Sequence, residues 1–283
     1  MNYLLYNPLA NYGKGYETEI KALKEIEIQF PDCEEIDYSD TIFEDVAKVL
    51  KPGDNIILLG GDGTINYLIN DLKNIPTPED INYYYYPAGT ENDFMKDVQD
   101  KGFGNTNIIP LTEFIKKLPT VKFNNKEMLF FIAVGFGIDG KTYAEAEALR
   151  SKGKKINLNS ITSSLVKKFE KTNCTVVVDG VTKEYKEVYL APTMNSRYYV
   201  DGMNAAPEQN RLSGELSFVV IHDQEGRGAK ALGLINKGQH TKFPEACEII
   251  KGKHISVTFD KPSYLEVDGE LFENITSYEA WTE

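Results

Sequence analysis

The stretch IILLGGDGTINYLINDL, residues 56–72, joins an apolar run, a glycine-dense turn and a segment with helical periodicity. The four apolar residues at its start are too few for a helix and suit a parallel strand that is covered on both faces. The apolar residues after the turn follow the i, i+3, i+4, i+7 spacing of a helix that lies on a sheet. They are Ile65, Leu68, Ile69 and Leu72. The stretch therefore predicts one strand, turn and helix of an α/β fold.

The turn in this stretch has the composition of an anion site. Gly60, Gly61 and Gly63 permit close backbone approach, and the unpaired N–H groups and positive dipole end at the start of a helix attract phosphate. No Gly-Lys-Ser/Thr follows, and Asn66 stands where the dinucleotide fingerprint has its third glycine. Two interpretations remain, a phosphate cradle of another kind or glycines that serve packing only.

Asp62 lies in the middle of this turn. An acid beside a phosphate is repelled unless a divalent cation lies between them. Asp62 is therefore a candidate Mg²⁺ ligand, and its alternative role is to cap the helix.

The composition is that of an acidic globular chain. Its 283 residues are 41% hydrophobic and 26% charged, with a net charge of −12 and a pI near 4.9. This charge argues against nucleic acid and against a polybasic membrane anchor, but not against brief contact with a bilayer. The N-terminus has no signal-peptide pattern, and no run reaches the ~18 apolar residues of a membrane span. The three cysteines are far apart, so we expect a cytoplasmic protein without disulfides or a zinc site.

Residues 1–122 alternate strand-like and helix-like segments, which is typical of parallel βαβ units. A strand-like run at 83–86 leads into PAGTENDF. This motif places Gly89, Thr90, Asn92 and Asp93 at the carboxyl end of a strand, where open α/β sheets bind ligands. Asn92 and Asp93 could instead cap the next helix, but their recurrence beside the first loop favours a site.

Strand patterns dominate from residue 123 to residue 283, apart from a mainly helical segment at 141–171 and one predicted helix at 228–236. Strands are expected at 129–134, 175–178, 184–191, 216–221, 254–259 and 264–267. Such a run predicts a β-sandwich domain. Near its end, Asp268 and Glu270 flank a glycine at a hairpin tip. The pair is either a solvated turn or a source of a carboxylate that accepts a proton or holds a metal.

Four motifs in order, an early NP and GKG, then GGDGTINYLIND, PAGTENDF and VDGE, resemble the diacylglycerol kinase catalytic-domain family. The resemblance is to its soluble bacterial lipid kinases; sphingosine kinases are relatives, and NAD kinases more distant ones. It spans nearly the whole chain and includes GFGID at 135–139 and GMNAAP at 202–207. It implies a three-layer α/β nucleotide domain, a C-terminal β-sandwich whose last residues could pack back on the first domain, and an active site in the cleft between the domains.

The resemblance also implies roles for individual residues. The ATP phosphates would lie on Gly60, Gly61, Asp62, Gly63 and Thr64. The nucleotide site would be lined by Asn7, Gly89, Thr90 and Asn92. Asp62 and Asp93 would serve Mg²⁺, and Asp62, Asp268 and Glu270 would be catalytic, with Glu270 as the general base and Asp268 as its support.

Two departures from the family pattern bear on these expectations. Ser213 stands where bacterial members have an Asp that helps to hold a structural metal. The stretch 105–111 lacks an acidic residue that some members carry. With these departures the resemblance still implies ATP binding, but it no longer defines the lipid specificity or the degree of activity.

The expected function is an ATP- and Mg²⁺-dependent kinase that phosphorylates a hydroxyl of diacylglycerol or a related lipid. Such an enzyme would be cytoplasmic, would visit the membrane surface transiently, would not bind nucleic acid, and could be a homodimer. The alternatives are an NAD kinase-like enzyme, which shares a GGDGT loop, and a nucleotide-binding regulator without catalysis.

Overall fold

The computed structural model describes residues 1–10, 15–99 and 107–283. The chain divides into two compact units, Met1–Lys116 and Lys117–Glu283. Two parts of the sequence predictions lie outside the described residues. They are Gly13 and Lys14 of the predicted GKG loop, and Asn105 and Thr106 of the stretch without an acidic residue.

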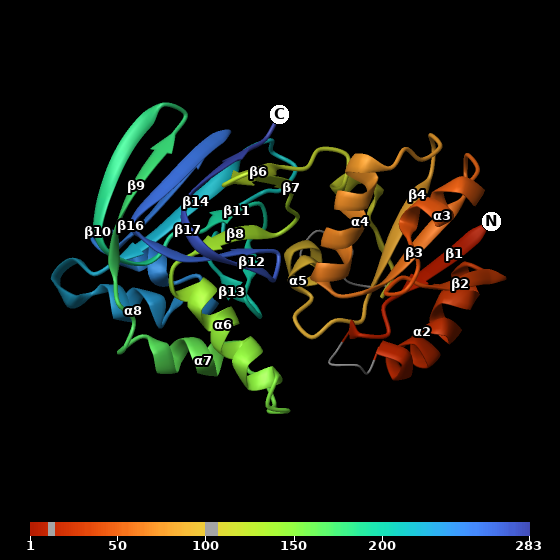
Figure 1. Ribbon diagram of the computed structural model, residues 1–283, viewed down its shortest axis with the longest axis horizontal. Helices are drawn as coiled ribbons and strands as arrows, with labels where there is room; N and C mark the ends of the chain where they lie inside the picture. Colours follow the sequence, from red (N-terminus) through yellow and green to blue (C-terminus); the bar gives the residue numbers. More distant parts are fainter. Residues whose placement is uncertain (11–14, 100–106) are drawn as a thin grey trace. The chain divides into compact units, whose positions relative to one another are not determined.

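The first unit is a five-stranded sheet with helices packed against it (Figure 1). The strand order is β2-β1-β3-β4-β5, with β1 to β4 parallel and β5 antiparallel to β4. The strands are β1 (Asn2–Tyr6), β2 (Cys33–Asp37), β3 (Asn55–Gly60), β4 (Asn82–Pro87) and β5 (Ile109–Pro110). The helices are α2 (Gly15–Gln29), α3 (Phe43–Val49), α4 (Asp62–Asn74), α5 (Asp93–Val98) and the 3₁₀ turn η2 (Thr112–Phe114).

The central strand β3 explains why this sequence forms a parallel sheet. It pairs with β1 on one side and β4 on the other, and residues 56–59 are fully buried. Helix α4 follows one residue after the strand and buries Ile65, Leu68 and Ile69. The predicted strand, glycine turn and helix are confirmed, and the helix begins at Asp62, within the turn itself.

The second unit contains a ten-stranded sheet and a two-stranded hairpin. Six strands close on themselves in the order β16-β8-β11-β14-β10-β9, because β9 pairs again with β16. The strands are β6 (Thr120–Phe123), β7 (Lys126–Leu129), β8 (Ala133–Phe136), β9 (Thr172–Val178), β10 (Val181–Leu190), β11 (Thr193–Met194), β12 (Tyr198–Tyr199), β13 (Met203–Asn204), β14 (Leu216–His222), β15 (Cys247–Gly252), β16 (His254–Val267) and β17 (Glu270–Trp281). The result is the β-sandwich-like domain that the strand pattern predicts.

The helices of the second unit are α6 (Ile138–Arg150), α7 (Leu158–Leu165), α8 (Gly228–Leu232) and the 3₁₀ turns η3 (Gln224–Gly226), η4 (Ile235–Lys237) and η5 (His240–Lys242). The core of this unit is apolar and rich in aromatic rings. The Phe136 ring lies 4.1 Å from that of Phe259 and 5.9 Å from that of Tyr278, measured between centroids. Such edge-to-face pairs stabilise the core beyond the area they bury. Within the described ranges, no helix has the length and apolar content needed to cross a membrane.

Several sequence predictions in the second unit were wrong in detail. The strand expected at 129–134 is interrupted between β7 and β8, because the N–H groups of residues 131–133 donate to a side chain instead of to a strand. The helix expected at 228–236 ends at Leu232 and resumes as η4. The strands expected at 254–259 and 264–267 form one strand, β16, with register shifts between them, and β15 and β17 were not predicted. The two compact units divide between Lys116 and Lys117, and β6 pairs with β17 within the second unit.

Candidate functional site

The first loop of the candidate site connects β3 to α4. A Cβ atom at Gly60 would lie 2.3 Å from Thr64 Oγ1, so only glycine fits there. A Cβ atom at Gly63, in contrast, would meet nothing within 4 Å, and Gly63 is exposed. Gly60 is thus a packing glycine, whereas the backbone at Gly63 is open to a ligand at the positive end of the α4 dipole.

The second loop follows β4 and lies directly against the first. The N–H groups of Ala88 and Gly89 donate to Gly60 O at 2.8 and 3.1 Å. A Cβ atom at Gly89 would lie 2.4 Å from Gly61 Cα, so the two backbones approach as closely as glycine allows. The predicted neighbourhood of the two loops is therefore observed within the first unit.

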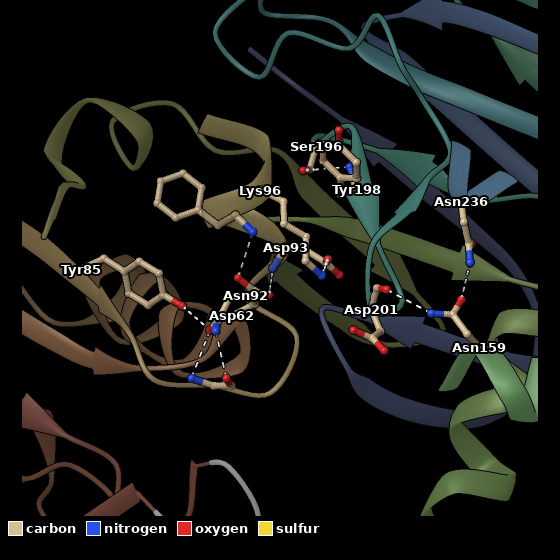
Figure 2. A network of polar contacts seen from close by, with 12 residues as sticks. Asp62, Tyr85, Asn92, Asp93, Lys96, Asn159, Ser196, Tyr198, Asp201 and Asn236 are labelled. Carbon is tan, nitrogen blue, oxygen red and sulfur yellow. Dashed lines mark hydrogen bonds and ion pairs between the residues drawn. The ribbon is translucent and has the colours of Figure 1, made fainter. Parts of the chain in front are cut away.

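Asn92 fixes the shape of the second loop. It has a left-handed φ of 48°, a conformation that asparagine tolerates better than most residues. Its Oδ1 accepts from Gly89 N at 3.0 Å and from the Tyr85 hydroxyl at 3.1 Å, and its Nδ2 donates to Gly89 O at 2.9 Å (Figure 2). Burial raises the pKa of Tyr85 well above its usual value, and the nearby carboxylates of Asp62 and Asp93 add to this, so the hydroxyl keeps its proton and donates.

Asp62 joins the first loop to the helix after the second. Its Oδ2 accepts from Asp93 N at 2.6 Å and its Oδ1 from Phe94 N at 3.1 Å, which places the carboxylate at the start of α5 (Figure 2). No side-chain hydrogen bond caps the start of its own helix, α4. Asp93 is buried and forms an ion pair with Lys96 at 2.9 Å. Asp62 therefore caps a helix, but a different one from the helix considered in the sequence.

The other predicted nucleotide residues lie around these loops. Asn7 follows β1, its N–H donates to Leu59 O at 3.1 Å, and its Nδ2 donates to Thr64 Oγ1 at 3.3 Å. Thr90 is exposed at the tip of the second loop. The first unit thus brings together Asn7, the glycine loop, Gly89 and Asn92.

Asp268, predicted to be catalytic, is a backbone anchor in the second unit. Its carboxylate accepts hydrogen bonds from the N–H groups of Phe131, Ile132 and Ala133, the last two at 2.8 and 2.9 Å. Three amide donors strongly favour the ionised form of a carboxylate. Asp268 therefore holds the chain between β7 and β8, and its carboxylate is directed to that segment.

Glu270, the predicted base, begins β17 on the far side of the turn from Asp268. Its side chain is 43% exposed and lies 3.3 Å from Lys126 Nζ in an ion pair. Lys126 also lies over the Phe272 ring, 4.2 Å from its centroid. The structure gives Asp268 and Glu270 different partners: backbone amides for Asp268 and the Lys126 ammonium for Glu270.

The region of Ser213 is held by hydrogen bonds. Ser213 Oγ accepts from Glu215 N at 3.2 Å, and Gln209 Nε2 donates to Glu215 O at 2.8 Å. Ser217 Oγ donates to Gln209 Oε1 at 2.6 Å. In the part of the chain that the structure describes, no three His, Cys, Asp or Glu side chains gather as a metal cluster.

Sequence reasoning missed the partners that orient the site. Tyr85 belongs to a tyrosine run that predicts only a strand, and Lys96 lies one helical turn after Asp93. Asp139 belongs to the GFGID motif, in which the sequence suggests no role for it, yet it is buried and its pKa is raised to about 6 by that burial. The sequence does carry one signal for such residues, an acid shortly after an apolar strand, as at Asp62 after β3 and at Asp139 after β8.

Comparisons with known proteins agree with this two-unit architecture. Residues 2–121 match the diacylglycerol kinase catalytic domain, and residues 132–278 match the YegS C-terminal NAD kinase beta sandwich-like domain. Among curated proteins, the chain is similar to "Putative lipid kinase YtlR" of Bacillus subtilis, with 28% identity over 76% of this chain and 74% of YtlR. It is also similar to "Putative lipid kinase SERP0390" of Staphylococcus epidermidis, with 24% identity over 77% of this chain and 70% of that protein.

The fold is also found in a solved structure, that of "a putative diacylglycerol kinase from Bacillus anthracis str. Sterne". The likeness covers 100% of this chain and 92% of that chain with a TM-score of 0.70 and 20% sequence identity. At this identity it shows the fold alone. On the two domain matches, the chain belongs to the diacylglycerol kinase catalytic-domain family, a kinase family, as a member whose second unit is the YegS-type β-sandwich domain.

Proposed function

We propose that this protein is an ATP- and Mg²⁺-dependent lipid kinase that transfers the γ-phosphoryl group to a hydroxyl of diacylglycerol or a related lipid. The observation that carries the proposal is the open backbone at Gly63, at the start of a 13-residue helix whose first residue is Asp62. Phosphoryl transfer depends chiefly on positioning and charge stabilisation, and such a loop supplies both. The lipid kinases similar to this chain support the acceptor class.

In the proposal, the first unit binds the nucleoside triphosphate. Gly61 is extended with φ −102° and ψ −175°, and the helix dipole of α4 is directed at the loop. Asn7 and Asn92 border the loop with amide groups held by the backbone. In the proposal, these residues orient the phosphates for in-line transfer.

Asp62 suits a magnesium ion that is shared with a nucleotide. Protein Mg²⁺ sites commonly use one or two carboxylates together with waters and substrate phosphates, so a cluster of three acids is not required. Asp62 Oδ2 accepts from Asp93 N and Oδ1 from Phe94 N, and a carboxylate oxygen can accept from more than one partner, a cation included. Bound there, Mg²⁺ would neutralise phosphate charge. Asp93, which is buried against Lys96, would act through the loop and not as a ligand.

Glu270 is the proposed general base. A carboxylate on an exposed turn can reach the acceptor hydroxyl, and a base must come within about 2.6–3.2 Å of the proton donor. The side chains of Lys126 and Glu270 are 46% and 43% exposed. An ion pair this exposed can change partners at little cost in free energy. The acceptor hydroxyl would replace Lys126 as the partner of Glu270.

A basic segment of the second unit supports transient contact with a membrane. Residues 141–171 carry eight Lys and Arg residues and three Glu residues, in a chain whose net charge is −12. The connection between α6 and α7 is exposed and contains Lys152, Lys154 and Lys155. Basic residues close to an anionic leaflet each contribute about 1 kcal/mol of binding free energy. The proposal thus gives an acidic protein a local route to its lipid.

The direct test is an acceptor assay. Protein and labelled ATP would be incubated with a total lipid extract, with defined diacylglycerol and, separately, with NAD, and the labelled product identified. We expect Mg²⁺-dependent label in a lipid. Label in NAD would favour the NAD kinase alternative, and ATP binding without any labelled acceptor would favour the regulator.

Glu270→Gln should lower kcat about 10²- to 10⁴-fold, which is the usual contribution of a general base. The KM for ATP should change little, because Glu270 lies in the unit without the glycine loops. Glu273→Gln is the matched control, since Glu273 is an exposed glutamate on the same strand. Steady-state kinetics on the identified lipid would check this, and wild-type kcat in Glu270→Gln would remove Glu270 from the mechanism.

Gly63→Ala should weaken ATP binding at least tenfold without loss of stability. The added methyl group enters space that is open in the protein and that the proposal gives to phosphate. Gly60→Ala is the contrasting variant, because its methyl group would collide with Thr64 and lower the thermal midpoint. Calorimetric titration with ATP and thermal unfolding separate the two effects. Full ATP affinity in a stable Gly63→Ala protein would exclude phosphate from this side of the loop.

The double variant Lys154→Glu, Lys155→Glu should bind anionic vesicles at least about tenfold more weakly, given about 1 kcal/mol for each lost basic residue. The control is Lys237→Glu, Lys242→Glu, which reverses two exposed charges elsewhere in the unit. Sedimentation with phosphatidylglycerol and phosphatidylcholine vesicles at low and high salt measures the difference. Equal losses in both double variants would show that net charge, and not this segment, governs binding.

A further inference from the structure

A pair of buried carboxylic acids lies at the base of the hairpin that carries Glu270. Asp139 and Glu266 are 1% and 3% exposed. A Cβ atom at Gly135 would lie 2.3 Å from Asp139 Oδ2 and 2.8 Å from Glu266 Oε2, so both carboxyl groups occupy the space that glycine leaves. Gly135 is the strand partner of Glu266 between β8 and β16, which fixes this meeting point.

Neutral donors, a tyrosine hydroxyl among them, contact Asp139. Asp139 accepts from Gly140 N at 2.8 Å and from the Tyr199 hydroxyl at 3.3 Å. Burial raises the pKa of Tyr199 and the pKa of Tyr278 on β17 well above the usual value. The negative charge of Asp139 adds to both increases. Burial likewise raises the pKa of Asp139 to about 6. Two acids that face each other in such a place resist double ionisation.

Glu266 connects the pair to the catalytic hairpin. Its Oε1 accepts a hydrogen bond from Gly269 N, in the turn between Asp268 and Glu270. That turn is tight, with φ 49° at Asp268 and φ 91° at Gly269. The bond therefore sets where β17 begins, and with it the position of Glu270.

The hairpin that supplies Tyr199 is held in an unusual conformation. Val200, Asp201 and Gly202 have φ values of 47°, 58° and 89°, and a left-handed β-branched residue such as Val200 is rare. Asn159 Nδ2 donates to Asp201 O at 3.2 Å, and Asn236 Nδ2 donates to Asn159 Oδ1 at 2.8 Å (Figure 2). Strained backbone persists where the surroundings fix it, and here it sets the donor to Asp139.

We propose that Asp139 and Glu266 share a proton and act as a positioning pair, which holds the Asp268-Gly269-Glu270 turn through the bond from Gly269 N to Glu266. Neither residue touches the substrate in this role. The inference rests on the proposed function for its effect on turnover, whereas the shared proton itself does not depend on catalysis.

The pair makes the hairpin sensitive to pH. A carboxyl whose pKa is higher in the folded protein than in the unfolded chain contributes most stability when protonated. For Asp139 this contribution is present below its ordinary pKa and is lost as pH rises through about 6. Full ionisation of the pair at higher pH would place two charges beside Gly135 and loosen the turn.

Three variants separate positioning from a merely structural role. Glu266→Gln keeps an oxygen for Gly269 N and removes the titrating group, so we expect kcat within about threefold of wild type and a flatter pH profile between pH 5 and 8. Glu266→Ala removes the acceptor, so kcat should fall at least tenfold while the KM for ATP is unchanged. Asp139→Asn should flatten the same pH profile. Wild-type kcat in Glu266→Ala, or equal losses in Glu266→Gln and Glu266→Ala, would overturn the proposal.

Carboxyl NMR titration of the whole protein tests the shared proton without an activity assay. In wild type, the Asp139 resonance should titrate well above the usual aspartate range, and in Glu266→Gln its midpoint should move down. An Asp139 midpoint in the ordinary range, or one that Glu266→Gln leaves unchanged, would refute the pair. Absence of lipid phosphorylation by wild type would refute the proposed function. The titration would still show whether Asp139 and Glu266 share a proton.

Discussion

The hydrogen bonds between the Asp62 carboxylate and the first amides of α5 hold the candidate nucleotide site together. They connect a loop after β3 to a helix after β4, two segments separated by about thirty positions in the chain. Because parallel strands end at one edge of their sheet, both loops are already neighbours there. The carboxylate fixes how they meet, and it does so with the oxygens of the residue expected to serve the metal.

A carboxylate also organises the second unit through backbone amides. Asp268 accepts from three consecutive N–H groups that no strand uses, and it thereby shapes the chain between β7 and β8. In both units, an acid that follows a buried strand satisfies amides that would otherwise be unpaired in the interior. Such acids are costly to replace whatever their part in catalysis, so loss of activity in an Asp62 or Asp268 variant would not by itself prove a chemical role.

The sequence could predict the fold because its strongest signals are local. The apolar run at 56–59, the glycines and the helix period place β3, the loop and α4 within one or two residues. The site could be predicted as a set of residues for a similar reason, since glycines and polar residues recur at the ends of β3 and β4. The partners of the predicted catalytic residues could not be predicted, because they are distant in the sequence. Asp268 and Phe131 are 137 positions apart, and Glu270 and Lys126 are 144 apart. Only the folded chain shows that Asp268 is an anchor and that Glu270 is paired.

The most direct measurement of the central claim is amide hydrogen exchange of the whole protein with and without ATP and Mg²⁺. If the glycine loop holds the phosphates and Asp62 ties it to α5, exchange should slow at residues 61–65 and at Asp93 and Phe94 together. Unchanged exchange at both loops under saturating nucleotide, or slowing confined to the second unit, would contradict the account.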